Sequence, residues 1–315
     1  MLRYILKRFL SLVISLAIAS LVIFAVIEIA PGDPATFMLG LNAQPETLAA
    51  LRSELGLDMS KPHRYLAWVS GMMTGDFGTS YTYRTPVADM VAQRLWVSLP
   101  LAAYALALST LIAFPVGIYA AARRGRLGDM GVMGATQLGV AVPNFWFAMI
   151  LVLLFAIKLR WFPAGGFVGW EDGLRAGLHS LTLPAIALAL PQAAILARVM
   201  RSALLDVLGE DFMRTARAKG LTPRQTLWQH GLRNAMIPVL TIIGLQFSFL
   251  LAGAIIIEQV FFLPGLGSLI FQSISARDLI VVESVTMILV FAVIFVNFCV
   301  DLAYAAVDPR LRTRR

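Results

Sequence analysis

The sequence predicts an all-α integral membrane protein with about six transmembrane helices. Of its 315 residues, 59% are hydrophobic and only 14% are charged, whereas soluble domains carry roughly 25% charged residues. Apolar runs of about 20 residues, the length that crosses a bilayer, recur along the whole chain. The basic residues behind the net charge of +8 cluster at the ends of these runs. They therefore indicate membrane orientation and not nucleic-acid binding.

Six apolar stretches define the predicted organisation. The fourth contains Pro184 and Pro191, which membrane helices tolerate when neighbouring groups satisfy the freed carbonyls. The first is longer than the apolar part of a signal peptide, so we interpret it as a retained helix. The stretches are 9–29, 97–122, 132–157, 181–198, 237–257 and 285–307. The predicted parts are an N-terminal membrane helix (1–30), an extracytoplasmic loop or cap (31–96), a five-helix core (97–307) and a tail (308–315).

The distribution of Lys and Arg predicts that both termini are cytoplasmic. The segments on the side of the termini, with the adjoining helix edge, hold 17 Lys and Arg, and the opposite side holds 9. Many of those 9 lie in one long loop, which counts little toward orientation.

The long loop after the first helix carries signals of its own helices. Pro45 opens a helical stretch that ends at Gly56, and Pro62 precedes Tyr65 and Trp68, which share a helical face. We expect a small helical cap on the outer face of the membrane.

The longest cytoplasmic loop, 206–236, contains a helix, a turn and a second helix. Residues 204–219 are good helix formers, and Gly220 follows where a left-handed conformation ends a helix. Thr222 then fits an N-cap, with Gln225 as its capping-box partner.

The first helix of this loop is amphipathic. Leu208, Phe212 and Ala216 fall on one face, while basic residues occupy the other sides. Such a helix can lie on lipid headgroups, pack on its own bundle or bind a partner protein.

The segment Arg214-Thr215-Ala216-Arg217-Ala218-Lys219-Gly220 resembles the cytoplasmic EAA loop of binding-protein-dependent ABC importer permeases. Only Ala216, Gly220 and Leu232 match the general pattern. Arg214 and Thr215 stand where Glu and Ala are usual, and His230 and Arg233 stand where Ile and Pro are usual. The match is closer to the dipeptide/oligopeptide branch, where this segment precedes His-x-Leu-Arg-Asn-Ala. Further matches span roughly 1–312, among them Pro31-Gly32-Asp33-Pro34, Leu55-Gly56-Leu57-Asp58, Gly75-Asp76-Phe77-Gly78, Pro143-Asn144-Phe145-Trp146, Leu263-Pro264-Gly265-Leu266-Gly267 and Asp308-Pro309-Arg310.

The resemblance implies a permease subunit of a type I ABC importer in the inner (plasma) membrane. Its partners would be lipid, a second homologous permease, one or two ATP-binding subunits and an extracytoplasmic substrate-binding protein. ATP and Mg²⁺ would be bound by the ATP-binding subunits and not by this chain. The solute would be a dipeptide, an oligopeptide, glutathione or a nickel chelate. The residues that would dock on the ATPase are Phe212, Arg214, Thr215, Ala216, Arg217, Ala218, Lys219 and Gly220.

The family pattern also places the solute pathway along the second, third and fifth membrane helices. Pro115, Pro143, Asn144 and Gly253 are the candidate pathway-shaping residues, since Pro and Gly favour local departures from a straight helix. Close packing of small residues explains the glycine equally well.

The chain has no sequence signature of an enzyme. A P-loop requires a Gly-Lys dipeptide, and none occurs, so we expect no ATP hydrolysis by this chain. Cys299 is a single thiol, and His63, His179 and His230 appear isolated in loops, so we expect no metal site.

Two alternatives from other functional classes remain at this point. A proton-coupled secondary transporter would need a membrane carboxylate, and the candidates are Glu28, Glu258 and Asp301. None of them is predicted near mid-bilayer, where a proton relay is expected. A membrane scaffold without transport activity is the other alternative.

Overall fold

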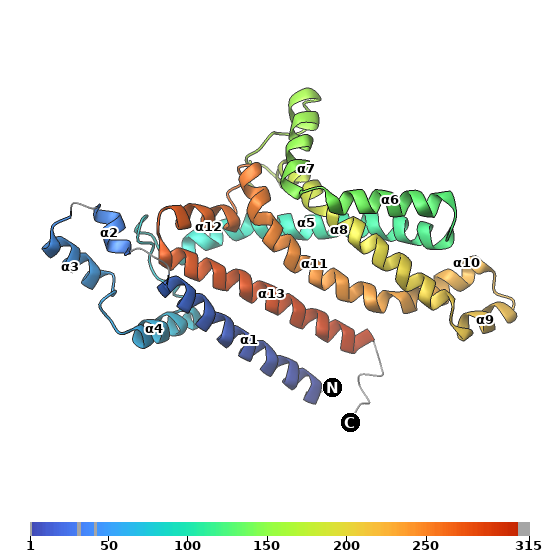
Figure 1. Ribbon diagram of the computed structural model, residues 1–315, viewed down its shortest axis with the longest axis horizontal. Helices are drawn as coiled ribbons and strands as arrows, with labels where there is room; N and C mark the ends of the chain where they lie inside the picture. The colour runs from blue at the N-terminus through green and yellow to red at the C-terminus, as the bar shows by residue number, and fades with distance from the viewer. Residues whose placement is uncertain (1, 30–32, 41–42, 308–315) are drawn as a thin grey trace. The chain divides into compact units, whose positions relative to one another are not determined.

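The computed structural model describes residues 2–29, 33–40 and 43–307, and its named elements are all helices. The predicted tail 308–315 lies outside the described residues. The helices form two compact units, and Figure 1 shows their order along the chain. We call Lys7–Ser98 with Pro264–Phe295 the cap unit, and Leu99–Leu263 with the adjoining terminal segments the core unit.

The cap unit contains the predicted helices of the long loop. Helix α3 (Pro45–Glu54) starts with Pro in its first turn, and Gly56 follows it with φ +67°, as the sequence predicts. Helix α4 (Lys61–Thr74) ends at Gly75 in the left-handed conformation. It packs on α1 (Leu2–Ile29), where the hydroxyls of Ser20 and Tyr65 lie 2.9 Å apart. A short helix α2 (Pro34–Leu39) was not predicted.

Helix α5 (Val87–Ala122) begins ten residues before the predicted start at 97. Its first turns lie in the cap unit, where Val87 and Val91 pack with Leu266 and Val285 in one apolar cluster. Leu266 opens α12 (Leu266–Ser275), an apolar helix too short for the length criterion and therefore not predicted. The cluster also includes side chains of α13 (Leu279–Val307).

The core unit is built around α8 (Leu174–Leu208). Of its most apolar 18 residues, 78% are buried, compared with 11% for α1. It contacts α6 (Leu127–Ala141), α7 (Asn144–Leu151) and α11 (Leu232–Val260). Helix α8 is therefore the central helix of this unit.

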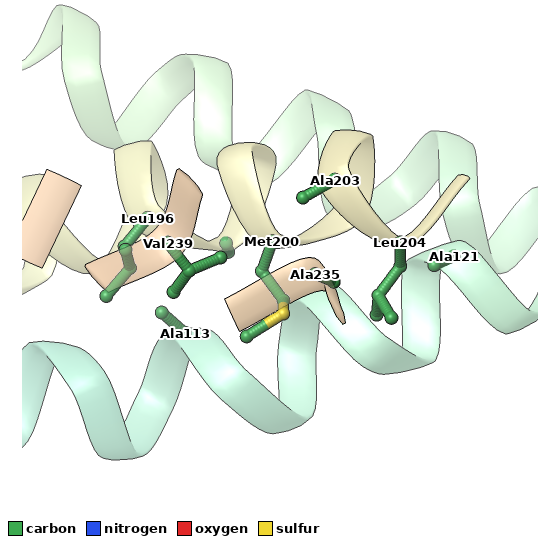
Figure 2. Close-up of a cluster of buried hydrophobic side chains, with 9 residues drawn as sticks. Ala113, Ala121, Leu196, Met200, Ala203, Leu204, Ala235 and Val239 are labelled. Carbon is green, nitrogen blue, oxygen red and sulfur yellow. The ribbon is translucent and has the colours of Figure 1, made fainter. Parts of the chain in front are cut away.

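Small side chains bring α8 close to its neighbours. Figure 2 shows Met200 and Leu204 of α8 among alanines of α5 and α11. A Cβ atom on Gly117 of α5 would lie 2.7 Å from the carbonyl oxygen of Ala197 and would not fit. Gly117 therefore permits the close approach of α5 to α8.

Two membrane helices differ from the prediction. The predicted third helix, 132–157, is broken after Ala141, and its halves meet at an angle of 99°. Pro143 causes the break, because it has no N–H to donate and disfavours helical geometry at Val142. The second half continues from α7 into a π-helix, η1 (Val152–Lys158). Five described helices are thus long and apolar enough to span, or six if the bent pair is one span.

The two prolines of the fourth membrane helix do not interrupt it, although its hydropathy is the lowest among the five described spans. Helix α8 is unbroken from Leu174 to Leu208 although Pro184 and Pro191 lie inside it. Both prolines are buried, so neighbouring helices surround the positions where the backbone loses a hydrogen bond.

The expectation that the histidines lie in loops is wrong. His63 is in α4, His179 in α8 and His230 in a π-helix. His179 Nε2 lies 3.0 Å from the carbonyl oxygen of Trp161, and its ring stacks on Phe162. Glu258 is likewise fully buried inside α11 and not beyond the helix end.

Candidate functional site

The loop between the fourth and fifth membrane helices begins with a break that the sequence did not predict. Helix α8 ends at Leu208, and a separate helix α9 (Asp211–Ala218) follows. Glu210 between them is extended, with ψ 151°, so 204–219 is not one helix. The break lets α9 leave the direction of α8, and Figure 1 shows α9 at the end of α8 distant from α7.

The turn after α9 has the predicted capping geometry. Gly220 has φ +94°, a conformation that glycine adopts without strain. The backbone N–H of Gln225 donates to the hydroxyl of Thr222, and the Gln225 carboxamide oxygen accepts from the Thr222 N–H at 2.9 Å. The turn of the chain is thus fixed on both sides by backbone conformation and hydrogen bonds.

The second half of the loop is part of a membrane helix. Helix α10 (Pro223–Thr226) passes through a π-helix, η2 (Leu227–Gly231), into α11 without a gap. Together they form one helical stretch from Pro223 to Val260. The turn at Gly220 therefore leads directly into the fifth membrane helix.

Helix α9 packs on this stretch through Met213 and Ala216, which are 0% and 6% exposed. The Met213 methyl carbon would be 3.4 Å from a Cβ on Gly231 of η2. Phe212 was predicted to share an apolar face with Ala216, but it is 43% exposed, and Met213 is the large side chain that is buried with Ala216.

The outward side of α9 is a mixed apolar and cationic surface. Exposed basic side chains and small residues surround Phe212, and the ion pair between Arg214 and Asp211, at 3.5 Å, is highly exposed and weak. Cationic side chains around an aromatic anchor suit a partner surface with acidic groups. We call this the docking surface, and it comprises Phe212, Arg214, Thr215, Arg217, Ala218, Lys219 and Gly220.

Three of the four candidate pathway residues lie at two neighbouring features of the core unit. Pro143 is at the break, and Asn144 is the first residue of α7. A Cβ on Gly253 of α11 would lie 3.9 Å from Asn144 Nδ2 and 3.2 Å from Leu188 of α8. Pro115 is exposed on α5, away from these contacts.

A polar contact between a buried glutamine of α11 and the backbone of α8 was not predicted from the sequence. Gln246 is 2% exposed, and its Nε2 donates to the backbone carbonyl of Gln192 at 2.7 Å. The side-chain carbonyl oxygens of both glutamines have no hydrogen-bond partner in the described part of the chain. Polar groups inside a membrane bundle mark pathways, so glutamines within apolar runs were the available signal.

An apolar cavity of about 470 Å³ lies beside the broken helix. Its walls come from α5, α6, α7 and α8, and include Val142, Phe147 and Pro191. Its lining has few polar groups, so it does not suit a charged solute.

Comparisons with known proteins agree with this architecture. Residues 113–313 match the family described as "Binding-protein-dependent transport system inner membrane component", and residues 1–102 match its N-terminal companion family. A Brucella suis biovar 1 protein named as a peptide transport system permease is 41% identical over 98% of both chains. The glutathione transport system permease protein GsiC of Escherichia coli (strain K12) is 38% identical over 99% of both.

One solved structure shares the fold. An inward-facing form of the MetNI methionine ABC transporter includes a chain that superposes with a TM-score of 0.59 at 18% identity. The superposition covers 70% of this chain and 96% of that one.

Proposed function

This chain belongs to the family of inner membrane components of binding-protein-dependent transport systems and is the permease subunit of an ABC importer, and we propose that α9 couples it to a separate ATPase. The single observation that carries this proposal is the geometry of α9. It is anchored inward by Met213 and Ala216, and it exposes Phe212 with basic neighbours outward. A rigidly held helix transmits a displacement, whereas a loose loop absorbs it.

The residues of α9 divide into two roles in this proposal. Phe212 and the basic side chains contact the ATPase, while Ala216 holds the helix on its own chain and does not reach the partner. Gly220 and the Thr222 cap keep the chain turn fixed, so that movement of α9 reaches α11. ATP and Mg²⁺ belong to the ATPase subunits, because this sequence contains no Gly-Lys dipeptide for a P-loop.

The complete importer contains further subunits under this proposal. A second, homologous permease completes the pathway, one or two ATPase subunits dock on the cytoplasmic side, and an extracytoplasmic protein delivers the solute. Docking on a cytoplasmic ATPase requires α9, and with it both termini, to face the cytoplasm. The Lys and Arg distribution supports the same orientation.

We assign the solute to the peptide class, including glutathione. The support is the similarity at about 40% identity along the full chain to relatives named for peptide and glutathione transport. Within the core unit, the break at Pro143, the contact between Asn144 and Gly253, and the Gln192–Gln246 pair are where the pathway is expected. Pro115 would act only through the shape of α5.

The comparisons give no support to a proton-coupled transporter. In the cap unit, Glu28 is occupied by ion pairs with Arg64 at 3.1 Å and Lys61 at 3.5 Å.

The test compares two exposed phenylalanines that are expected on opposite sides of the membrane. Phe212 on α9 is 43% exposed, and Phe37 on α2 is 54% exposed. We expect Phe212→Ala to reduce co-purification with the ATPase and solute uptake, while membrane abundance is unchanged. Phe37→Ala should leave ATPase binding intact. Equal ATPase binding by wild type and Phe212→Ala would rule out Phe212 as the anchor.

A further inference from the structure

The cap unit holds a second cavity, of about 360 Å³, whose lining is strongly charged. Its walls come from the end of α1, from α2 to α4, from the loop before α5 and from the start of α13. The volume falls within the range of roughly 300–1,000 Å³ that is typical of small-molecule sites. The charged lining residues are Glu28, Asp33, Arg52, Lys61, Arg64 and Glu283.

Five of these six charged groups are held in ion pairs. Glu28 is shared by Arg64 and Lys61, and the latter side chain is 69% exposed at the rim. Asp33 accepts from Arg52 at 3.3 Å and from the Thr36 hydroxyl. Each of the three cations therefore forms its ion pair with Glu28 or Asp33 and not with Glu283.

Glu283 is the exception. It is only 7% exposed, and its Oε1 atom has no hydrogen-bond partner in the described part of the chain. It stands on α13 between the charged cavity and an adjoining cavity of about 270 Å³, and it lines both. A buried carboxylate oxygen without a hydrogen bond is unfavourable unless a donor group of a ligand reaches it.

Tyr81 forms part of the wall shared by the two cavities. Burial raises the pKa of Tyr81 to about 12, against the opposing effect of Arg64. Its phenol is therefore neutral at physiological pH and adds no charge that could serve Glu283.

We propose that this cavity is a binding site for a small zwitterion, such as a short peptide, whose ammonium group pairs with Glu283 and whose carboxylate pairs with Lys61. The inference rests on the proposed function for the identity of the ligand as a peptide. The ammonium donates to the carboxylate that lacks a partner, and the ligand carboxylate meets the exposed, loosely paired ammonium at the rim. The net charge of the cavity lining, three carboxylates against three cations, suits a ligand of zero net charge.

The experiment uses the assembled transporter in lipid nanodiscs, without the binding protein, and measures equilibrium binding of three probes. Glycylglycine carries both charges, glycinamide only the ammonium, and N-acetylglycine only the carboxylate. We expect glycylglycine to bind most tightly and N-acetylglycine not to bind. Glu283→Gln should weaken glycylglycine and glycinamide by about tenfold or more, because each loses a charge-assisted hydrogen bond.

Lys61→Met provides a variant at an exposed site, where misfolding is not expected. It should weaken glycylglycine severalfold and leave glycinamide unchanged. Glu46→Gln on the exposed start of α3 is the matched control and should change neither probe. Glycylglycine binding that is unaffected by both Glu283→Gln and Lys61→Met overturns the site.

These outcomes are separable from failure of the proposed function. If the importer carries peptides but neither variant affects probe binding, the cavity proposal fails and the function stands. If the importer carries no peptide but binds glycylglycine in a Glu283-dependent way, the site stands and the solute assignment fails. If Glu283→Gln weakens glycylglycine binding only when the binding protein is added, Glu283 is a contact for that protein, and the proposal is overturned.

Discussion

Arg201 on α8 and Asp129 on α6 form a two-point ion pair. The Arg201 Nε atom lies 2.6 Å from Oδ1 of Asp129, and Nη2 lies 2.7 Å from Oδ2. The backbone N–H of Gly125, in the turn between α5 and α6, donates to Oδ2 at 2.9 Å. Asp129 therefore links α6 and the turn before it to α8, and Figure 1 shows the turn between α5 and α6 at the same end of the core unit as α9.

Loss of this ion pair should destabilise the protein. Asp129 is 3% exposed, so Asp129→Asn leaves the Arg201 guanidinium facing a neutral amide where it now meets a carboxylate. We expect a lower thermal unfolding temperature in detergent and lower uptake. Arg201→Lys keeps the charge but loses the planar guanidinium, so its unfolding temperature should fall less than that of Asp129→Asn. A variant Asp129→Asn as stable as wild type would show that the pair contributes little.

Substitution of Gly220 separates backbone strain from steric obstruction. At φ +94° a β-branched residue is strained by on the order of 1–2 kcal/mol, although no heavy atom lies within 4 Å of its Cβ position. Gly220→Val should therefore reduce uptake, with membrane abundance near normal. Gly220→Asn is the control, because Asn tolerates positive φ. If both variants lose ATPase binding equally, the partner approaches Gly220 too closely for any side chain.

Two alanines of α9 test its inward and outward faces. Ala216 is buried and Ala218 is exposed. Ala216→Asp places a carboxylate against Met213 and should detach α9, at a cost of several kcal/mol. Amide hydrogen exchange over 211–218 should rise in Ala216→Asp and not in Ala218→Asp. Unchanged protection in Ala216→Asp would mean that α9 is not held by this face.

Orientation can be tested with reporter fusions. A fusion after Leu57 in the cap unit and another after Gly220 should report opposite sides of the membrane, since an odd number of spans separates them in the predicted topology. Finding both on one side would contradict the cytoplasmic assignment of α9 and of the termini.

Local signals predicted local structure well. Gly220, Thr222 and Gln225 act through backbone conformation and hydrogen bonds between near neighbours, so their roles were readable from residue type and spacing. The same holds for Pro45 and Gly56 at the ends of α3. The 99° break at Pro143 was not predicted, because membrane helices also accept proline without breaking, as Pro184 and Pro191 do in α8.

Contacts between distant residues could not be predicted. Asp129 and Arg201 are 72 positions apart, and Gln192 and Gln246 are 54 apart. The sequence gives no sign that Glu283 is buried, because its burial depends on helices that are distant along the chain. Leu208 was placed on one helical face with Phe212 and Ala216, but the break at Glu210 puts Leu208 in a separate helix, and this break leaves no strong sequence signal.

The unbroken length of α8 has a mechanical consequence. Thirty-five helical residues extend about 50 Å, and the hydrocarbon layer is about 30 Å thick, so roughly 20 Å of the rod stands outside that layer. A continuous helix of this length transmits a tilt along its whole axis. A tilt imposed near α9 would therefore move the opposite end of α8 in the reverse direction.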